Sequence, residues 1–301
     1  MSDRPLAITT VSTSSHLSRV RVLAQSLLRH HPELSLSVLL VDEPAGRFDP
    51  ADQPFDVIRL EDVEHRDLLA QVGAHRAAGD CANSMKAALL EHVLAGGCWA
   101  AIHLDTDMLV TGRLDPLIAA LDGGSVVLTP HLLTSPRGLA ARSVLQAVQV
   151  AGVMNGGVVG VRGDARGRAF LGWWGDRLAV CCTADPARGV FHDQRWLDLA
   201  PGLLEGVAIL DDPGTNVAFW NLTERPLTRH DGELRAGGVP CRLLHLSGYD
   251  PGRPHLVSVH MPDLTTDVAG LLGEITAQYR EALVDAGWEE SSTWPWVYAT
   301  P

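Results

Sequence analysis

The sequence predicts an α/β protein whose Rossmann-like, mostly parallel sheet is flanked by helices and followed by a C-terminal helical extension. The first observation is an alternation of short apolar segments, read as strands, with longer segments of helical periodicity. The second is that several of these strands end in polar residues, among them Ser12, Asp42 and Asp105. Because ligands bind at the carboxyl ends of parallel strands, this pattern indicates a site there. The third is a length of 301 residues, 46% of them hydrophobic, which is enough for a substantial core.

The N-terminal half reads as strand–helix units. A strand at Leu6–Val11 precedes a helical pattern from Leu17 to Leu28, and a second apolar strand, Leu36–Val41, follows. Such a β-α-β unit builds parallel sheets. No Gly-x-Gly-x-x-Gly follows the first strand, so the dinucleotide-binding fingerprint is absent. The other elements expected in this half are a strand at Val57–Leu60, a helix capped by Asn83 and ending at Leu94, strands at Ala100–Leu104 and Met108–Val110, a helix at Leu114–Leu121 and a strand at Val126–Thr129.

The C-terminal half continues the alternation with shorter elements. We expect helices at Gly138–Val150, Ala165–Cys182 and Arg195–Leu199, strands at Val158–Val161, Val207–Leu210 and Val217–Trp220, and a hairpin of Glu233–Arg235 with Arg242–Leu246. A last helix, Thr266–Ala286, precedes Trp288, Trp294 and Trp296. There is no internal repeat or linker. We therefore expect a main domain over residues 1–255, with residues 256–301 forming a helix and a Trp-rich tail that pack on it.

Two aspartates directly follow the apolar strand Ala100–Leu104. If the chain stays extended, Asp105 and Asp107 point to the same side and repel each other unless a cation lies between them. Carboxylate oxygens suit Mg²⁺ or Mn²⁺, which also bind phosphate oxygens. The pair therefore predicts a clamp for a metal-bound diphosphate. The alternative is a polar strand end at which Asp107 caps the next turn.

The composition excludes several classes of function. A formal net charge of −12 argues against a general nucleic-acid binder. No apolar run approaches the ~20 residues that span a bilayer, and residues 1–5 lack the features of a signal peptide, so we expect a cytoplasmic protein. The five cysteines show no metal-ligand spacing and are expected to be reduced thiols. The sequence leaves the oligomeric state open.

Five short motifs occur in a distinctive order along the chain. They are Lys86, Asp105-Thr106-Asp107, Asn155-Gly156-Gly157, Asp193-Gln194 and His245-Leu246-Ser247-Gly248. In this order they resemble bacterial glycosyltransferases of the GT-A fold, and most of all the retaining enzymes of glycosyltransferase family 8. The resemblance extends from about Leu6 to Pro251 and implies that residues 1–255 form a nucleotide-sugar-binding catalytic domain. One departure concerns the family's last motif, which often continues to a lysine. Here Tyr-Asp-Pro-Gly-Arg-Pro follows Gly248, and Arg253 is the only basic residue available.

The resemblance implies a metal-dependent, retaining transfer of a sugar from a nucleotide sugar, with UDP as the nucleotide, to a hydroxyl group of a saccharide or natural product. Mn²⁺ or Mg²⁺ would be held by Asp105, Asp107 and His245. The donor would contact residues at the strand ends and in the motifs, namely Thr10, Val11, Ser12, Asp42, Lys86, Asp105, Asn155, Gly156 and Gly248.

Gln194 and Asp193 are the implied catalytic residues. A glutamine amide is a poor nucleophile, so double displacement through Gln194 is unattractive. In a front-face reaction the leaving phosphate takes the acceptor's proton, and the side-chain oxygen of Gln194 stabilises the oxocarbenium-like centre. Asp193 would bind the sugar ring, or act as a base if it faced the acceptor. His131 is expected on the acceptor side, and Trp196 or Trp220 either stacks on a sugar or packs in the core.

Structural roles remain open for each of these residues. By itself Lys86 is more typical of a surface helix, His245 is compatible with a structural strand position and Gly248 with a simple turn. Asp193 could be a helix N-cap with Gln194 solvated in the first turn. Two other functions also remain open: a sugar nucleotidyltransferase, and a non-catalytic nucleotide-sugar-binding protein. Residues 11–18 lack the Gly- and Lys/Arg-rich loop that nucleotidyltransferases usually have after the first strand.

Overall fold

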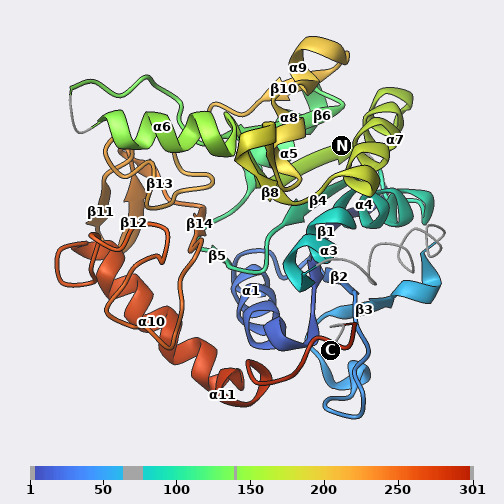
Figure 1. Ribbon diagram of the computed structural model, residues 1–301, viewed down its shortest axis with the longest axis horizontal. Coiled ribbons are helices and arrows are strands. Elements are labelled where there is room, and N and C mark those ends of the chain that lie inside the picture. Colours follow the sequence, from blue (N-terminus) through green and yellow to red (C-terminus); the bar gives the residue numbers. More distant parts are fainter. Residues whose placement is uncertain (1–3, 64–76, 139–140, 299–301) are drawn as a thin grey trace.

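The computed structural model describes residues 4–63, 77–138 and 141–298, and a seven-stranded sheet forms its centre (Figure 1). The strand order is β10-β6-β7-β4-β1-β2-β3. The strands are β1 (Leu6–Ser12), β2 (Leu36–Leu40), β3 (Asp56–Arg59), β4 (Ala100–Leu104), β6 (Val126–Pro130), β7 (Met154–Arg162) and β10 (Val207–Ile209). Of these, β7 alone runs antiparallel to its neighbours, β4 and β6. The mixed α/β architecture with a mostly parallel sheet is confirmed.

Helices cover both faces of the sheet, and consecutive strand residues pack in two separate hydrophobic cores, one on each face. Ala101 packs in the core under α4 (Lys86–Ala95) and α7 (Ala165–Val180), whereas Ile102 packs in the core under α1 (Leu17–His30) and α5 (Asp115–Gly123). The same alternation separates Val159 from Val158 on β7. Period-two burial of this kind follows from the pleat of a strand covered on both sides. The remaining helices are α3 (Ala78–Ser84), α6 (Ala141–Ala151), α8 (Gln194–Leu197), α9 (Ala200–Leu203), α10 (Leu271–Asp285) and α11 (Trp288–Ser291).

Small sheets complete the fold, and one of them differs from the expected hairpin. β14 (Leu243–His245) pairs antiparallel with β5 (Met108–Val110), which directly follows the two aspartates. The expected partner, β12 (Glu233–Ala236), instead lies between β11 (Leu227–His230) and β13 (Val239–Pro240). Leu243 and Leu244 are both fully buried, which a surface hairpin would not permit. β8 (Ala184–Asp185) and β9 (Val190–Phe191) form a short ribbon.

Four other expectations about local structure are wrong. The segment Val217–Trp220 is not a strand, because Asn216 adopts φ 59° and only Val217 forms a bridge, to Leu244. Asn83 lies inside α3 and does not cap α4. The Asn155-Gly156-Gly157 motif lies within β7 instead of before it. The last long helix begins at Leu271, not at Thr266, because Gly270 has φ 55°. Left-handed residues explain the first and last of these differences, and the pairing of Asn155 with Thr129 of β6 explains why its motif is part of β7.

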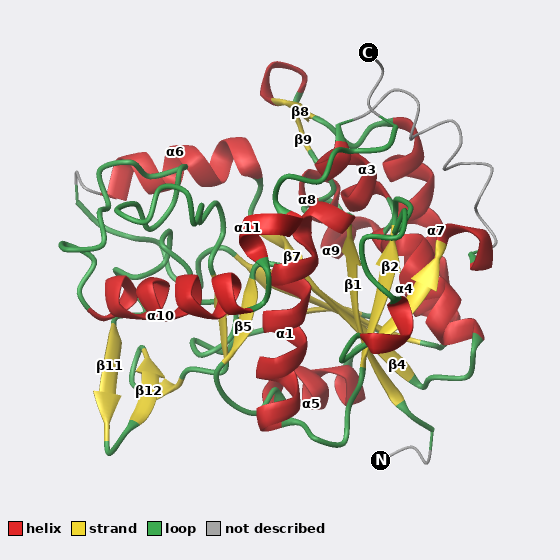
Figure 2. Ribbon diagram, turned by 90° about the horizontal axis from the view of Figure 1, so that it is seen from below, coloured by secondary structure: helices red, strands yellow, loops and turns green. Residues whose placement is uncertain are grey.

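The C-terminal extension shares a core with the first helix. α10 and α11 both contact α1, and Figure 2 shows these helices on one side of the sheet. The shared cluster contains residues from widely separated segments, including Val22, Leu246, Tyr249, Leu272, Tyr279 and Leu283. Trp294 stacks on Phe48 with ring centroids 6.1 Å apart. In the part of the chain that the structure describes, no helix is both long and apolar enough to cross a membrane.

Because of this shared core, Leu283→Ala is expected to destabilise the whole protein. Leu283 is fully buried against residues of the main domain, and the cavity left by such a change costs about 2–5 kcal/mol. Chemical denaturation followed by circular dichroism measures the loss. Glu281→Ala, at an exposed position of the same helix, is the control and should be nearly neutral. Two separate transitions, with the loss confined to one, would show that residues 256–301 fold independently.

Candidate active site

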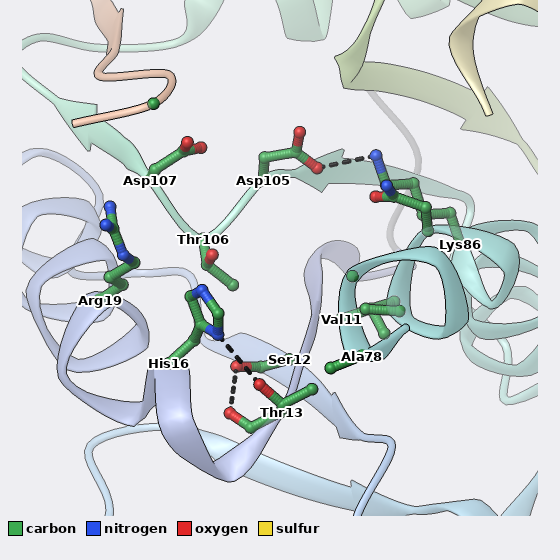
Figure 3. Close-up of a pocket in the computed structure, with 14 residues that line it drawn as sticks. Val11, Ser12, Thr13, His16, Arg19, Ala78, Lys86, Asp105, Thr106 and Asp107 are labelled. Atoms are coloured by element: carbon green, nitrogen blue, oxygen red, sulfur yellow. Dashed lines mark hydrogen bonds and ion pairs between the residues drawn. The ribbon is translucent and has the colours of Figure 1, made fainter. Parts of the chain in front are cut away.

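A polar cavity of about 270 Å³ opens at the carboxyl ends of β1 and β4. Figure 3 shows its walls: the end of β1 and the start of α1 on one side, α3 and α4 on another, and the two aspartates above them. Its lining includes Val11, Ser12, Arg19, Lys86, Asp105 and Asp107, together with Gly248. The expected site at the sheet edge is therefore a real cavity with charged walls.

Lys86 is the buried centre of the charges beside this cavity. Its Nζ lies 2.8 Å from Asp105 Oδ1 and 3.0 Å from Asp193 Oδ2, and donates to the carbonyl of Gly156 at 3.1 Å. Burial alone would lower the pKa of Lys86, but Asp105 and Asp193 outweigh it and hold that pKa above its usual value. A surface lysine is therefore excluded, because the side chain is only 3% exposed.

Asp105 presents one of its two oxygens to the cavity. Oδ1 accepts hydrogen bonds from Lys86 and, at 3.0 Å, from Nε2 of His103. Burial alone would raise the pKa of Asp105, but the neighbouring ammonium and imidazole lower it, so the carboxylate stays ionised. The other oxygen, Oδ2, is thus the one that remains for a bound cation or hydroxyl group.

The hydrogen bonds of Asn216 orient His245 toward Asp107. The Asn216 amide nitrogen donates to Thr129 Oγ1 at 2.9 Å and to Asn155 Oδ1 at 3.0 Å, which leaves its oxygen to accept from His245 Nδ1 at 3.1 Å. In the tautomer assigned from this network, Nε2 of His245 carries the lone pair. That atom lies 3.3 Å from Asp107 Oδ1. Two electron-rich atoms so close together require a cation or a proton between them.

Asp105, Asp107 and His245 fit a divalent metal ion. One ligand atom from each residue can be chosen so that all three lie within 4.8 Å of one another. Burial alone would raise the pKa of Asp107, but the positive charge and hydrogen bond of a protonated His245 imidazole outweigh this and lower it, as a bound cation in the same place would. Two carboxylates and an imidazole are ligands that suit Mn²⁺, and the oxygens also suit Mg²⁺. The strand pairing of β14 with β5 brings His245 to this place.

Gln194 has a fixed orientation beside this group. Its amide nitrogen donates to the carbonyl of Ala151 at 2.8 Å, so its oxygen faces the backbone N–H of Gly156 at 3.3 Å and the amide of Asn155 at 3.4 Å. Asp193 makes no side-chain cap of α8, since its carboxylate is engaged by Lys86. Asp193 therefore occupies the N-cap position of α8 without capping it through its side chain, and Gln194 is hydrogen-bonded and half-buried instead of solvated.

The glycines of β7 permit these close approaches. A Cβ at Gly156 would overlap the carboxylate of Asp193, and one at Gly157 would lie 2.7 Å from the His245 ring. Gly248 has φ 69° and lines the cavity, where a Cβ would lie 2.5 Å from the ring of His260. These three positions therefore require glycine for reasons of space or backbone conformation.

Four expected donor-binding residues lie outside the lining of the cavity, namely Thr10, Asp42, Asn155 and Gly156, and of these Asn155 lines a second cavity. Asp42 accepts hydrogen bonds from the backbone N–H and hydroxyl of Ser14, at 2.8 and 2.7 Å, and so orders the loop after β1. Thr10 is fully buried within β1. Val11 and Ser12, the other two strand-end residues, do line the cavity. Asp42 therefore stabilises the loop after β1, while Val11 and Ser12 line the cavity.

Two residues that the sequence did not single out, Arg19 and Asn216, belong to the site. Arg19, in the first turn of α1, lines the cavity and donates to the carbonyl of Tyr249 at 2.6 Å (Figure 3). By contrast, Arg253, the residue available in place of the family's lysine, is exposed, lies 3.6 Å from Asp250 and is not part of the cavity lining. The only available signal for Arg19 was a basic residue in the helix after the first strand. Asn216 gave none, because its role depends on a left-handed backbone conformation.

A second cavity of about 460 Å³ lies on the other side of Asn155 and Gln194. It is lined by Trp220 and by His131, the residue for which the sequence predicts a place on the acceptor side. Trp196 instead packs against the core and donates its indole N–H to the carbonyl of Cys181 at 2.9 Å. The adjacent residues Gly248 and Ser247 line one cavity each, and Gln194, one of the candidate catalytic residues, lines the second.

Comparison with known proteins shows the fold. No family model matches the chain. The uncharacterized protein YfnD of Bacillus subtilis (strain 168) is 25% identical over 247 residues, which are 80% of this chain and 76% of YfnD. A crystal structure of the galactosyltransferase LgtC with donor and acceptor sugar analogues is similar at a TM-score of 0.56 and 17% identity, covering 92% of this chain and 95% of LgtC. The glycosyltransferase GlyE of Streptococcus pneumoniae TIGR4 gives 0.53 at 17% identity, over 99% of this chain and 66% of that structure. The chain therefore has the GT-A fold of glycosyltransferases.

If the three ligands hold a metal ion, Asp107→Ala is expected to weaken Mn²⁺ binding at least tenfold, and Asn216→Ala by about 10–100-fold through loss of the oriented imidazole. Isothermal titration calorimetry with Mn²⁺ measures both. Asp52→Ala serves as the control, because it removes an exposed carboxylate that is not part of the Asp105–Asp107–His245 group. Removing one of two repelling carboxylates should leave the fold intact. If both variants bind Mn²⁺ as tightly as the wild type, these residues do not hold the metal ion and His245 has a structural role.

Proposed function

We propose that the protein is a metal-dependent, retaining glycosyltransferase that moves a sugar from a nucleotide sugar, with UDP as the nucleotide, to a hydroxyl acceptor. The main support is one arrangement: Asp105 and Asp107 line a charged cavity, Gln194 lines an apolar one, and the adjacent residues Gly248 and Ser247 line one cavity each. A transferase needs its donor and acceptor side by side, with the reacting groups at their junction. LgtC, which shares the fold, was solved with donor and acceptor sugar analogues.

The charged cavity suits the nucleoside diphosphate. Val11 and Ser12 at the end of β1 would contact the nucleoside, and Arg19 together with the backbone N–H of Gly248 would face the phosphates. Asp105, Asp107 and His245 would hold Mn²⁺ or Mg²⁺, which supplies Lewis-acid neutralisation of the diphosphate. Lys86 does not need to reach the donor, because it already holds Asp105 and Asp193 in place. Asn155, Gly156 and Asp193 would line the place of the donor sugar.

The arrangement around Gln194 supports retention of configuration. Inversion needs a base on the acceptor side to take the hydroxyl proton. Asp193 is held by Lys86, and no carboxylate is present among the described residues that line the second cavity. In a front-face reaction the bond from the anomeric carbon to phosphate breaks, the acceptor oxygen bonds to the same face, and its proton passes to the leaving phosphate. The oxygen of Gln194 would stabilise the positive charge on the sugar.

Incubation with a panel of UDP-sugars and Mn²⁺ tests the function directly. We expect release of UDP, slowly to water and faster with an acceptor, and NMR of the product's anomeric proton should show the donor's configuration. A nucleotidyltransferase would release inorganic diphosphate, and a binding protein would release neither. An inverted product would overturn the proposed mechanism and make the exposed His260, at the edge of the second cavity, the candidate base.

Gln194→Ala is expected to lower kcat roughly 100-fold while the affinity for the donor changes little, because the lost electrostatic contact matters mainly in the transition state. Steady-state kinetics and calorimetric titration with UDP separate the two quantities. An active-site variant of LgtC with glutamine replaced by glutamate has also been crystallised. Gln149→Ala, an exposed amide on α6, is the matched control. An unchanged kcat in Gln194→Ala would show that Gln194 is not a catalytic residue.

Arg19→Ala is expected to weaken UDP binding about 10–100-fold, since the contact between a guanidinium and a phosphate is a charge-assisted hydrogen bond. Uridine, which lacks the phosphates, should bind both proteins equally well. Arg253→Ala is the paired control and should bind UDP like the wild type, because Arg253 is exposed and lies outside the cavity lining. If Arg253→Ala weakens binding and Arg19→Ala does not, Arg253 replaces the lysine of the related motif.

A further inference from the structure

The second cavity is chemically unlike the first. One wall is the helix α6, with Ala147, Val148, Val150 and Ala151 beside the amide of Gln146. The other includes Phe191, Phe219 and Trp220, with His260 at its edge. No Asp, Glu, Lys or Arg is found among the residues described at its surface. In a chain with 20% charged residues, a cavity of about 460 Å³ without one is a selective environment. Its walls offer contact to apolar surface and no partner for an ionic group.

The helix α6 has apolar residues that no core covers. Val144 and Val148, one turn apart, are half-buried, while Leu145 and Val150 are 36% and 46% exposed. None of the described α6 residues belongs to the four buried clusters that stabilise the protein. Figure 1 shows α6 lying outside the layers that flank the sheet. An amphipathic helix normally buries its apolar face, and here the space beneath that face is the cavity.

The polar groups at the inner end of the cavity are uncharged. His131 donates from Nδ1 to the carbonyl of Val153 at 3.3 Å and accepts from the amide of Asn155 at 3.2 Å. Burial lowers the pKa of His131 to about 4, in keeping with a neutral ring. Gln194 and Asn155 present amides, and Ser247 presents a hydroxyl group. This end can therefore orient one hydroxyl group beside the reacting centre, but it cannot compensate an ion.

We propose that this cavity binds the acceptor and selects an uncharged aglycone, meaning a hydroxyl group on an aromatic or alicyclic hydrocarbon skeleton, in preference to a saccharide. This inference rests on the proposed function and concerns the acceptor of that same site. A charged acceptor would lose its hydration without gaining a partner. A saccharide would bring several hydroxyl groups against Val148, Val150 and Phe219, where they find no hydrogen bonds. A hydrocarbon skeleton gains by leaving water and covers the apolar face of α6.

Acceptor binding is tested apart from transfer, by calorimetric titration of the protein with saturating UDP and Mn²⁺. The probes are 2-naphthol, its 6-sulfonate and methyl glucoside. We expect 2-naphthol to bind at least tenfold more tightly than either of the others, and to be glycosylated when a UDP-sugar is supplied. Equal or tighter binding of the glucoside or the sulfonate overturns the proposal. Failure of the proposed function is a different result, namely no UDP release with any UDP-sugar, even to water.

Two variants connect this binding to α6. Val148→Asp and Ala147→Glu each place a carboxylate in the apolar wall, and each is expected to weaken 2-naphthol binding at least tenfold. Calorimetric affinity for UDP in the same variants shows whether the donor site is intact. The control is Val180→Asp, which changes a valine that is 83% exposed at the end of α7 and should leave 2-naphthol binding unchanged. Wild-type affinity for 2-naphthol in both α6 variants would show that the cavity is not the acceptor site.

Discussion

The buried ion pairs of Lys86 determine the arrangement of the site. One ammonium group joins Asp105 at the end of β4, Asp193 before α8 and the carbonyl of Gly156 in β7. Removing one partner from such a buried group typically costs about 3–5 kcal/mol, because the others are left without compensation. With Asp107 nearby, three carboxylates face the ammonium group of Lys86 and the guanidinium group of Arg19, so negative charge remains in excess. A divalent cation balances that remainder, which is the electrostatic reason that the site favours a metal ion.

The antiparallel direction of β7 explains how a strand in the middle of the sheet contributes to this group. Ligand sites of parallel sheets lie at the carboxyl ends of the strands. Since β7 runs against β4, with Val158 opposite Leu104, its amino-terminal residues reach the same edge. Asn155 and the two glycines therefore meet the aspartates, and the glycines provide the space that Asp193 and His245 occupy. A fully parallel sheet would have placed these residues at the opposite edge.

The sequence predicted the elements that depend on local pattern, and missed those that depend on tertiary pairing. The strand at Ala100–Leu104 and its two aspartates follow from apolar periodicity and spacing. The pairing of β14 with β5 does not, because it joins segments more than 130 residues apart and competes with a nearer hairpin partner. Asn216 was missed because its left-handed conformation is imposed by its surroundings. Lys86 could be named from the motif order, but its burial could not be inferred from a helix that looks ordinary.

The proposed retention and the proposed choice of an apolar acceptor rest on the same property of the second cavity. With no carboxylate among the residues described there, the leaving phosphate is the anionic group that would take the acceptor's proton, as in the front-face reaction. The same lack of charge removes any partner for an ionic acceptor. With a hydrocarbon skeleton filling the cavity, the contact between the Gln194 oxygen and the positive charge that develops on the sugar would also be less screened and so stronger. The contrast between the charged donor side and the neutral acceptor side is thus part of the proposed chemistry as well as of the proposed specificity.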